Sequence, residues 1–155
     1  MIHLVLYEPE IPPNTGNAIR LCANTGATLH LVKPLGFRLD DKRLQRSGLD
    51  YRDLADLRVH ENLDACLAML PARVFGVETG GSRCYAELDY QPGDAFVFGP
   101  ETRGLPPSVL ERVGRDRTLF IPMRPQSRSL NLSNAVAIIA FDAWRHLGFT
   151  GRVAP

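Results

Sequence analysis

Short, mostly apolar runs recur along the chain and constrain its fold more than any other feature. Most of them are bounded by proline, glycine or charged residues. Runs of this length that are not alternately polar and apolar are typical of strands buried on both faces of a sheet. We predict strands at residues 2–7, 28–32, 57–60, 73–77, 95–98 and 118–121.

Segments with helical features separate these strands. Asn14 or Thr15 is placed to cap a helix that closes at Gly26, where a left-handed residue is favourable. Further helices are predicted over residues 40–47, 62–70, 105–110 and 135–144. Alternating strands and helices indicate an α/β fold, in which a parallel sheet carries helices on both faces. The length of 155 residues suits a single domain, residues 1–155.

Composition narrows the class of protein. Hydrophobic residues make up 45% and charged residues 23%, which is typical of a globular chain. The formal net charge of +1 predicts no broad nucleic-acid surface, so any RNA contact must come from local basic patches or from an oligomer. We expect Cys22, Cys66 and Cys84 to be reduced in a cytoplasmic protein, and we find no signal peptide or membrane-spanning run.

Several common functional motifs are missing. The chain contains no P-loop, no GxGxxG and no Gly-x-Ser-x-Gly elbow, which argues against the usual nucleotide-binding and serine-hydrolase sites. The four histidines are scattered, and no His, Cys, Asp and Glu set has metal-ligand spacing. We therefore predict no metal, and structural or surface roles for His3, His30, His60 and His146.

The stretch from Ile121 to Trp144 combines a polar loop with an apolar helix. The loop is rich in Ser and Asn, and Ser133 or Asn134 is a natural N-cap. A polar loop at a helix N-terminus offers N–H groups and hydroxyls to a ligand. The helix is apolar on nearly every side, which predicts burial all round, either in the core or between two subunits.

Three loops follow predicted strands: 8–20, 99–104 and 121–134. The carboxyl ends of parallel strands lie at one edge of a sheet, and open α/β sheets bind ligands at that edge. We therefore expect the three loops to line one ligand crevice.

Motifs in these loops resemble those of the SPOUT family of RNA ribose methyltransferases. The matching segments are Asn14-x-Gly-Asn-x-x-Arg20, Phe98-Gly-Pro-Glu-Thr-Arg-Gly104, and Ile121-Pro-Met followed by Ser129-Leu-Asn-Leu-Ser-Asn-Ala135. Three further features narrow the resemblance to one group within the family. They are the opening segment 6–17, the segment 40–44 and the lack of an added RNA-binding domain. The most similar members are minimal enzymes that methylate the 2′-hydroxyl of wobble nucleotide 34, a cytidine or modified uridine, in leucine tRNAs.

The resemblance implies a fold, a cofactor and partners. It implies an α/β fold with a C-terminal trefoil knot, S-adenosylmethionine as methyl donor, a homodimer, and binding to the anticodon region of tRNA. The residues matching the family's cofactor pocket are Val77, Gly99, Ile121, Ser129 and Leu130, and those matching its catalytic positions are Arg20, Ser129 and Asn131.

Arginine chemistry limits what Arg20 can do. A guanidinium is essentially always protonated, so we expect Arg20 to stabilise a developing 2′-alkoxide or grip a phosphate, not to act as a base. The candidate RNA contacts are Lys42, Arg43, Arg46, Arg103, Arg124 and Arg128. For Arg103, a structural salt bridge is an equal alternative.

Three other functions are compatible with parts of the sequence. One is a methyltransferase of the same family acting on another tRNA or rRNA nucleotide. Another is a non-catalytic RNA-binding module with the same fold. The third is a flavodoxin-like nucleotide-binding protein, which the missing phosphate motif disfavours.

Overall fold

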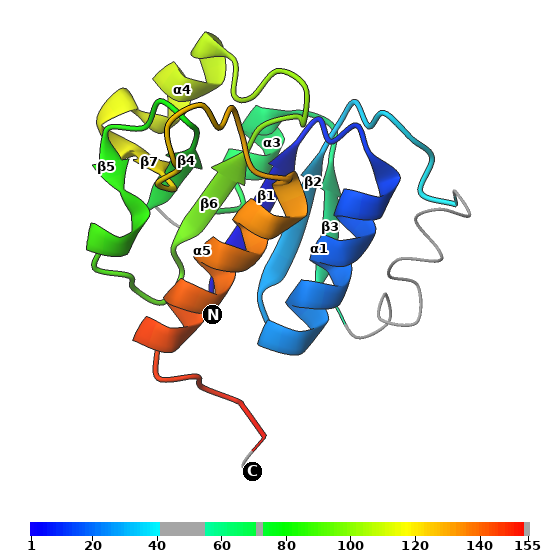
Figure 1. Cartoon of the computed structure of the whole chain (residues 1–155). Helices are drawn as coiled ribbons and strands as arrows, with labels where there is room; N and C mark the ends of the chain where they lie inside the picture. Colours follow the sequence, from blue (N-terminus) through cyan, green and yellow to red (C-terminus); the bar gives the residue numbers. More distant parts are fainter. Residues whose placement is uncertain (41–54, 71–72, 154–155) are drawn as a thin grey trace.

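A seven-stranded parallel sheet forms the centre of the molecule (Figure 1). The computed structural model describes residues 1–40, 55–70 and 73–153. Within them the strand order is β3-β2-β1-β6-β4-β7-β5, and every pair is parallel. The strands are β1 His3–Tyr7, β2 Thr28–Val32, β3 Leu57–His60, β4 Val74–Val77, β5 Arg83–Cys84, β6 Ala95–Phe98 and β7 Thr118–Phe120.

The predicted strands are confirmed to within one residue at their ends, and one strand was missed. β2 and β6 are buried along their whole length, as their apolar sequences predict. The missed strand β5 has only two residues, Arg83 and Cys84, and carries no apolar run. It is held by pairing with β7, a contact that local sequence does not reveal.

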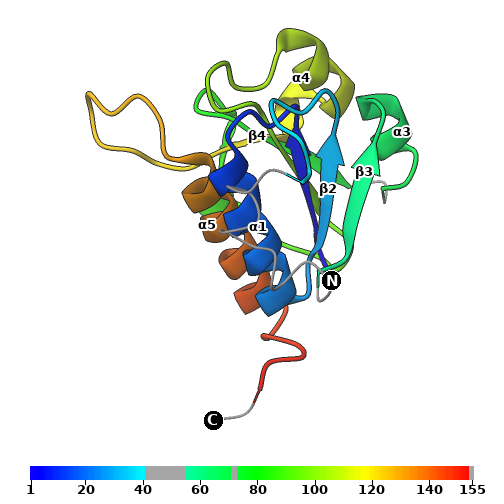
Figure 2. The ribbon, with the colours of Figure 1, turned by 90° about the vertical axis from the view of Figure 1, so that its right-hand side faces the viewer.

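Helices cover both faces of the sheet, as predicted. α1 Pro12–Thr25 and α5 Leu132–His146 lie side by side on one face, while α3 Leu63–Leu67 and α4 Pro107–Val113 lie on the other (Figures 1 and 2). Two apolar clusters match these layers. One contains Ile19 of α1 and Ile139 of α5, and the other contains Cys66 of α3 and Val109 of α4.

Both helices beside the candidate site begin earlier than the sequence analysis predicted. α1 begins at Pro12 with Ile11 as N-cap, because proline suits the first helical positions, where its missing N–H is not needed. The predicted caps Asn14 and Thr15 lie inside this helix. Its predicted closing residue, Gly26, does adopt the left-handed conformation, with φ of 72°.

The prediction that α5 is buried all round within the chain was wrong. Only Val136, Ile139, Ala140 and Ala143 are buried, at the spacing of one helix face. The side chain of Phe141 is 46% exposed. The alternative, a contact between subunits, stays a prediction, and so does the C-terminal knot.

Two other predictions concern the basic helix over residues 40–47 and membrane-spanning segments. The predicted helix 40–47, with Lys42, Arg43 and Arg46, falls outside the described residues except for its first position. Among the described helices, none has the length and apolar character needed to cross a membrane.

Candidate functional site

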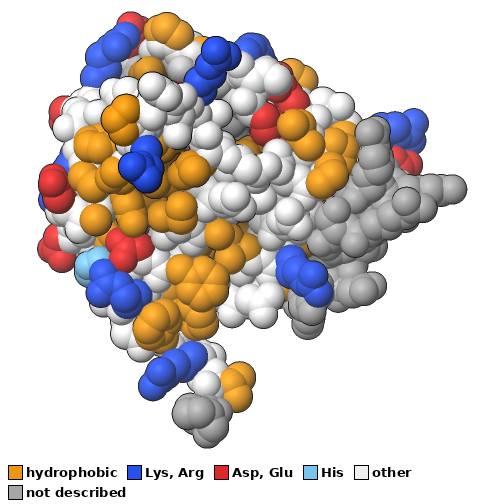
Figure 3. Space-filling view, viewed as in Figure 1, with side chains coloured by type: hydrophobic (Ala, Val, Ile, Leu, Met, Phe, Trp, Pro, Cys, Tyr) orange, Lys and Arg blue, Asp and Glu red, His pale blue; other side chains and the backbone are white. Residues whose placement is uncertain are grey.

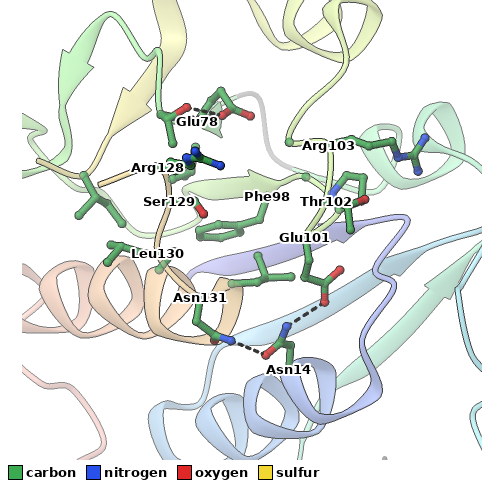
Figure 4. A pocket seen from close by; sticks show the side chains of 18 of the residues that line it. Asn14, Glu78, Phe98, Glu101, Thr102, Arg103, Arg128, Ser129, Leu130 and Asn131 are labelled. Atoms are coloured by element: carbon green, nitrogen blue, oxygen red, sulfur yellow. Dashed lines mark hydrogen bonds between the residues drawn. The ribbon is translucent and has the colours of Figure 1, made fainter. Parts of the chain in front are cut away.

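A pocket of about 490 Å³ lies at the carboxyl ends of β4, β6 and β7, beside the start of α5 (Figure 4). Its wall contains residues from the segments 77–79, 98–104 and 121–132, together with Ile11 and Asn14. The three loops predicted to share one edge of the sheet therefore do so. Chain direction explains this, because every strand in a parallel sheet delivers its following loop to the same edge.

The pocket contains all five residues predicted for cofactor binding. Val77, Gly99, Ile121, Ser129 and Leu130 each line it. The lining is mixed in character, because Val77, Ile121 and Leu130 are apolar and Ser129 is polar. Their role in binding a cofactor stays a prediction.

The predicted catalytic residues are only partly brought together. Ser129 and Asn131 line the pocket, whereas Arg20 does not. Arg20 is exposed on α1, and its carbonyl oxygen accepts a hydrogen bond of 2.8 Å from Nδ2 of Asn24. The structure therefore does not bring Arg20 together with the other two predicted catalytic residues in the pocket.

A chain of hydrogen bonds crosses the pocket edge from α5 to the loop after β6. Nδ2 of Asn131 donates to Oδ1 of Asn14 at 2.9 Å, and Nδ2 of Asn14 donates to Oε1 of Glu101 at 3.0 Å (Figure 4). Oδ1 of Asn131 in turn accepts from the backbone N–H of Ser133 at 2.9 Å and of Asn134 at 3.4 Å. Asn131 is therefore the N-cap of α5, two or three residues before the predicted cap.

Glu101 connects the first and second motifs. Its carboxylate also accepts from the backbone N–H groups of Glu10 at 2.8 Å and Ile11 at 3.1 Å. The Thr102 hydroxyl donates to Glu10 at 2.7 Å, and this hydrogen bond lowers the pKa of the Glu10 carboxyl. Sequence analysis assigned no site role to Asn14 or Glu101, although both lie within the quoted motifs.

Arg103 makes a structural ion pair. Its guanidinium lies 3.2 Å from a carboxylate oxygen of Glu8 and 3.5 Å from one of Glu10, and its side chain points away from the pocket (Figure 4). The salt-bridge interpretation of Arg103 is thus confirmed, while RNA contact stays a prediction. Of the other described candidates, Arg128 lines the pocket, whereas Arg124 is exposed outside it.

Two glycines let the loop after β6 fold tightly against itself and β4. A Cβ on Gly99 would lie 2.3 Å from the carbonyl carbon of Gly104, so the close approach that Gly99 permits is to the protein's own backbone. Gly104 has φ of 67°, and a Cβ there would meet Glu78. The Glu78 carboxylate is held by the N–H groups of Leu105 at 2.7 Å and Thr79 at 2.8 Å.

Comparison with protein families decides the class of this chain. Residues 1–141 match the SpoU rRNA Methylase family. The chain belongs to the SpoU rRNA methylase family. This membership confirms the resemblance drawn from the three motifs.

SpoU relatives align with the chain over nearly its whole length. A tRNA (cytidine(34)-2'-O)-methyltransferase of Methylovorus glucosotrophus is 54% identical, covering 99% of this chain and 100% of the relative. The enzyme of the same name from Escherichia coli K12 is 53% identical, covering 99% and 98%.

Solved structures show the same architecture. A structure described as giving insights into the 2-OH methylation of C/U34 on tRNA is 49% identical, covers 98% of both chains and has a TM-score of 0.90. An rRNA methyltransferase from Sinorhizobium meliloti with bound AdoMet has a TM-score of 0.83 at 24% identity, covering 94% of this chain and 56% of that one. At 24% identity, the similarity to the Sinorhizobium meliloti structure shows a shared fold alone.

Proposed function

We propose that this SpoU protein transfers a methyl group from S-adenosylmethionine to the ribose 2′-hydroxyl of wobble nucleotide 34, a cytidine or modified uridine, in leucine tRNAs. The observation that carries the proposal is the convergence of all three motif loops on one pocket. Relatives more than 50% identical over the whole chain bear the name of this reaction. The single domain would work in the cytoplasm.

The pocket fits the proposed cofactor in size and in character. A volume of about 490 Å³ suits a small-molecule site, and Val77, Ile121 and Leu130 offer apolar walls for an adenine ring. Loop backbone and Ser129 offer hydrogen bonds to polar groups. When bound, S-adenosylmethionine would supply an electrophilic methyl group on a sulfonium.

The residues of the chain would position the ribose and stabilise its charge. Asn131 presents an amide whose direction is fixed by Asn14 on one side and by the start of α5 on the other. Such fixed groups lower the barrier by holding the reacting oxygen in line. Arg20 would stabilise the developing alkoxide or hold the adjacent phosphate.

Homodimerisation would complete the site. Phe141 on α5 and Leu130 beside the pocket are 46% and 39% exposed, although both are large and apolar. Hydrophobic side chains gather on this face of the molecule (Figure 3). A second copy packed on it would cover these side chains and could bring its Arg20 near the pocket. Basic residues outside the pocket, such as Arg124, would then contact tRNA.

The function is tested by methyl transfer to bulk tRNA from cells that lack this protein. Labelled S-adenosylmethionine is the donor, and the labelled nucleoside is mapped. We expect 2′-O-methylcytidine or a 2′-O-methylated uridine at position 34. Label at another ribose would retain the chemistry and change the substrate. If the protein bound S-adenosylmethionine but transferred no label to tRNA already carrying its other modifications, a non-catalytic RNA-binding role would replace the proposal.

Arg20 offers a test of the mechanism. We expect Arg20→Ala to lower kcat/KM at least 100-fold, because a charge-assisted hydrogen bond in the transition state is worth roughly 3 kcal/mol. Arg20→Lys should retain appreciable activity if positive charge suffices. Arg152→Ala, an exposed arginine near the C-terminus, is the control. Full activity in Arg20→Ala would exclude any role in catalysis.

A further inference from the structure

Three of the four histidines meet in space, although they are far apart in the sequence. His3, His30 and His60 lie on the adjacent strands β1, β2 and β3. The strand register pairs His3 with Thr28 and His30 with Arg58, so each next histidine is displaced by two residues. Because alternate residues share a face, the three rings form a diagonal line on one side of the sheet. The spacing of the three histidines along the sequence gave no sign of this grouping.

The rings are hydrogen-bonded in series. Nδ1 of His3 lies 3.1 Å from Nε2 of His30, and Nδ1 of His30 lies 2.9 Å from Nε2 of His60. His30 is fully buried. Burial, helped by the neighbouring His3 and His60, lowers the pKa of His30 to about 4. Burial also lowers the pKa values of His3 and His60, and there the positive charge of Arg58 contributes. A neutral ring has one nitrogen lone pair that can bind a metal, and in this series an ion would replace a hydrogen bond between two rings.

The thiol of Cys66 joins this line from α3. One ligand atom each from His30, His60 and Cys66 lie within 4.8 Å of one another. In a tetrahedral zinc site neighbouring ligand atoms lie roughly 3.3–3.6 Å apart, as bond lengths of about 2.0 Å to nitrogen and 2.3 Å to sulfur require. Small side-chain movements would therefore complete the geometry. Two imidazoles and a thiolate are a donor set that zinc favours.

We propose that His30, His60 and Cys66 form a binding site for Zn²⁺ or a similar borderline-soft divalent cation. The ligating atoms are Nδ1 of His30, Nε2 of His60 and the Cys66 sulfur, and water fills the fourth position. The ion takes the place of the hydrogen between the two ring nitrogens. Nε2–H of His30 then donates to His3, the kind of outer hydrogen bond that usually orients a ligating histidine.

The proton balance is simple. Both imidazoles stay neutral. The ring whose proton lies between the two nitrogens changes its tautomer, so that His30 carries its proton on Nε2 and His60 carries its proton on Nδ1. Cys66 loses its thiol proton, and one proton is released for each ion bound. Burial raises the pKa of this thiol to about 11, so the protein must gain enough from the metal–sulfur bond to remove that proton.

Two negatively charged groups offset part of the positive charge at the proposed site. Arg58 disfavours a further cation, but it lies 2.9 Å from a carboxylate oxygen of Asp56, whose negative charge opposes this effect. The thiolate neutralises one charge of the ion. None of the three ligands lines the pocket after β6, so the site would join α3 to strands β2 and β3 without taking part in methyl transfer.

Cobalt and zinc titration of the full-length protein tests the proposal. The protein is stripped with a chelator and titrated with Co²⁺, which gives a thiolate charge-transfer band and visible d–d bands in a tetrahedral site. We expect one ion per chain, displaced by Zn²⁺. Cys66→Ser should lose the charge-transfer band, and His60→Gln should weaken binding at least tenfold. Cys84→Ser and His146→Gln are matched controls that should bind as the unchanged protein does.

Thermal unfolding gives a second readout. Saturating Zn²⁺ should raise Tm by roughly 5 °C in the unchanged protein and in Cys84→Ser, but not in Cys66→Ser. His3→Leu, which removes the outer hydrogen bond, should weaken affinity about 10-fold to 100-fold. Absence of a thiolate band, or equal binding by Cys66→Ser and Cys84→Ser, would overturn the proposal and leave the histidines as a hydrogen-bonded part of the core. Neither readout depends on methyl transfer.

Discussion

At the scale of single residues, the carboxylate of Glu101 sets the direction of the hydrogen bonds along the pocket edge. A carboxylate only accepts, so the Asn14 NH₂ group must face Glu101 and its oxygen must face Asn131. The NH₂ group of Asn131 then points to Asn14, which leaves its oxygen for the N–H groups at the start of α5. One ionised residue thereby orients an amide located 30 positions further along the chain.

We predict that Glu101→Gln lowers kcat/KM for methyl transfer about 10-fold to 100-fold. The glutamine NH₂ would face a backbone N–H or the Asn14 amide, and losing a charged hydrogen bond costs about 1.5–3 kcal/mol. Kinetics with tRNA and thermal unfolding would be measured together. Glu61→Gln is the control, because Glu61 forms an exposed ion pair with Lys33. Unchanged kinetics in Glu101→Gln would show that the orientation of Asn14 does not matter.

Gly99 offers a second test at this scale. We predict that Gly99→Ala destabilises the protein by about 3 kcal/mol and weakens S-adenosylmethionine binding, because the new Cβ would lie 2.3 Å from backbone that cannot move away freely. Denaturant unfolding and cofactor titration would measure the two effects. Gly80→Ala is a matched control, since a Cβ there meets nothing within 4 Å. Equal stability of the two variants would contradict the tight-loop argument.

At the scale of elements, Asn131 both caps α5 and contacts Asn14. We predict that Asn131→Ala lowers stability by about 1 kcal/mol and also impairs methyl transfer. Asn131→Asp should keep the cap, because a carboxylate accepts from the same N–H groups and suits a helix N-terminus. It should still lose activity, because it sets a carboxylate oxygen against the Asn14 oxygen.

The N-cap of α3 provides a control, because its loss should lower stability without changing activity. Asn62 accepts a hydrogen bond from the N–H of Ala65 at 2.9 Å, and it does not line the pocket. Asn62→Ala should therefore cost a similar stability without changing kcat/KM for methyl transfer. If Asn131→Asp were as active as the unchanged protein, the Asn131 to Asn14 hydrogen bond would have no catalytic consequence.

At the scale of the whole molecule, the exposed face of α5 predicts assembly. Phe141 contacts Trp144 edge to face with 5.7 Å between ring centroids, and its side chain is nearly half exposed. We predict that the unchanged protein sediments as a dimer and that Phe141→Arg weakens dimerisation at least 100-fold, because it removes apolar burial and introduces a charge. Met69→Arg, on an exposed residue after α3, is the control. A dimer that tolerates Phe141→Arg would place the interface elsewhere.

The sequence by itself determined the layered architecture and the location of the pocket. Short apolar runs such as Ala95–Phe98 are typical of strands buried on both faces, and helical segments between them favour parallel pairing. Parallel pairing sends the loops after β1, β6 and β7 to one edge, so Gly99, Ile121 and Ser129 could be expected together. These conclusions follow from local pattern and chain direction alone.

Only the tertiary structure decided which side chains meet. Asn131 contacts Asn14 across 117 positions, and Asn14 contacts Glu101 across 87. His30 meets His60 and Cys66 because two adjacent strands, β2 and β3, pair in a fixed register and α3 packs against them. The N-cap of α5 is Asn131, whose amide also donates to Asn14. Local propensity cannot encode such contacts, because their energy depends on geometry that exists only after distant segments have packed.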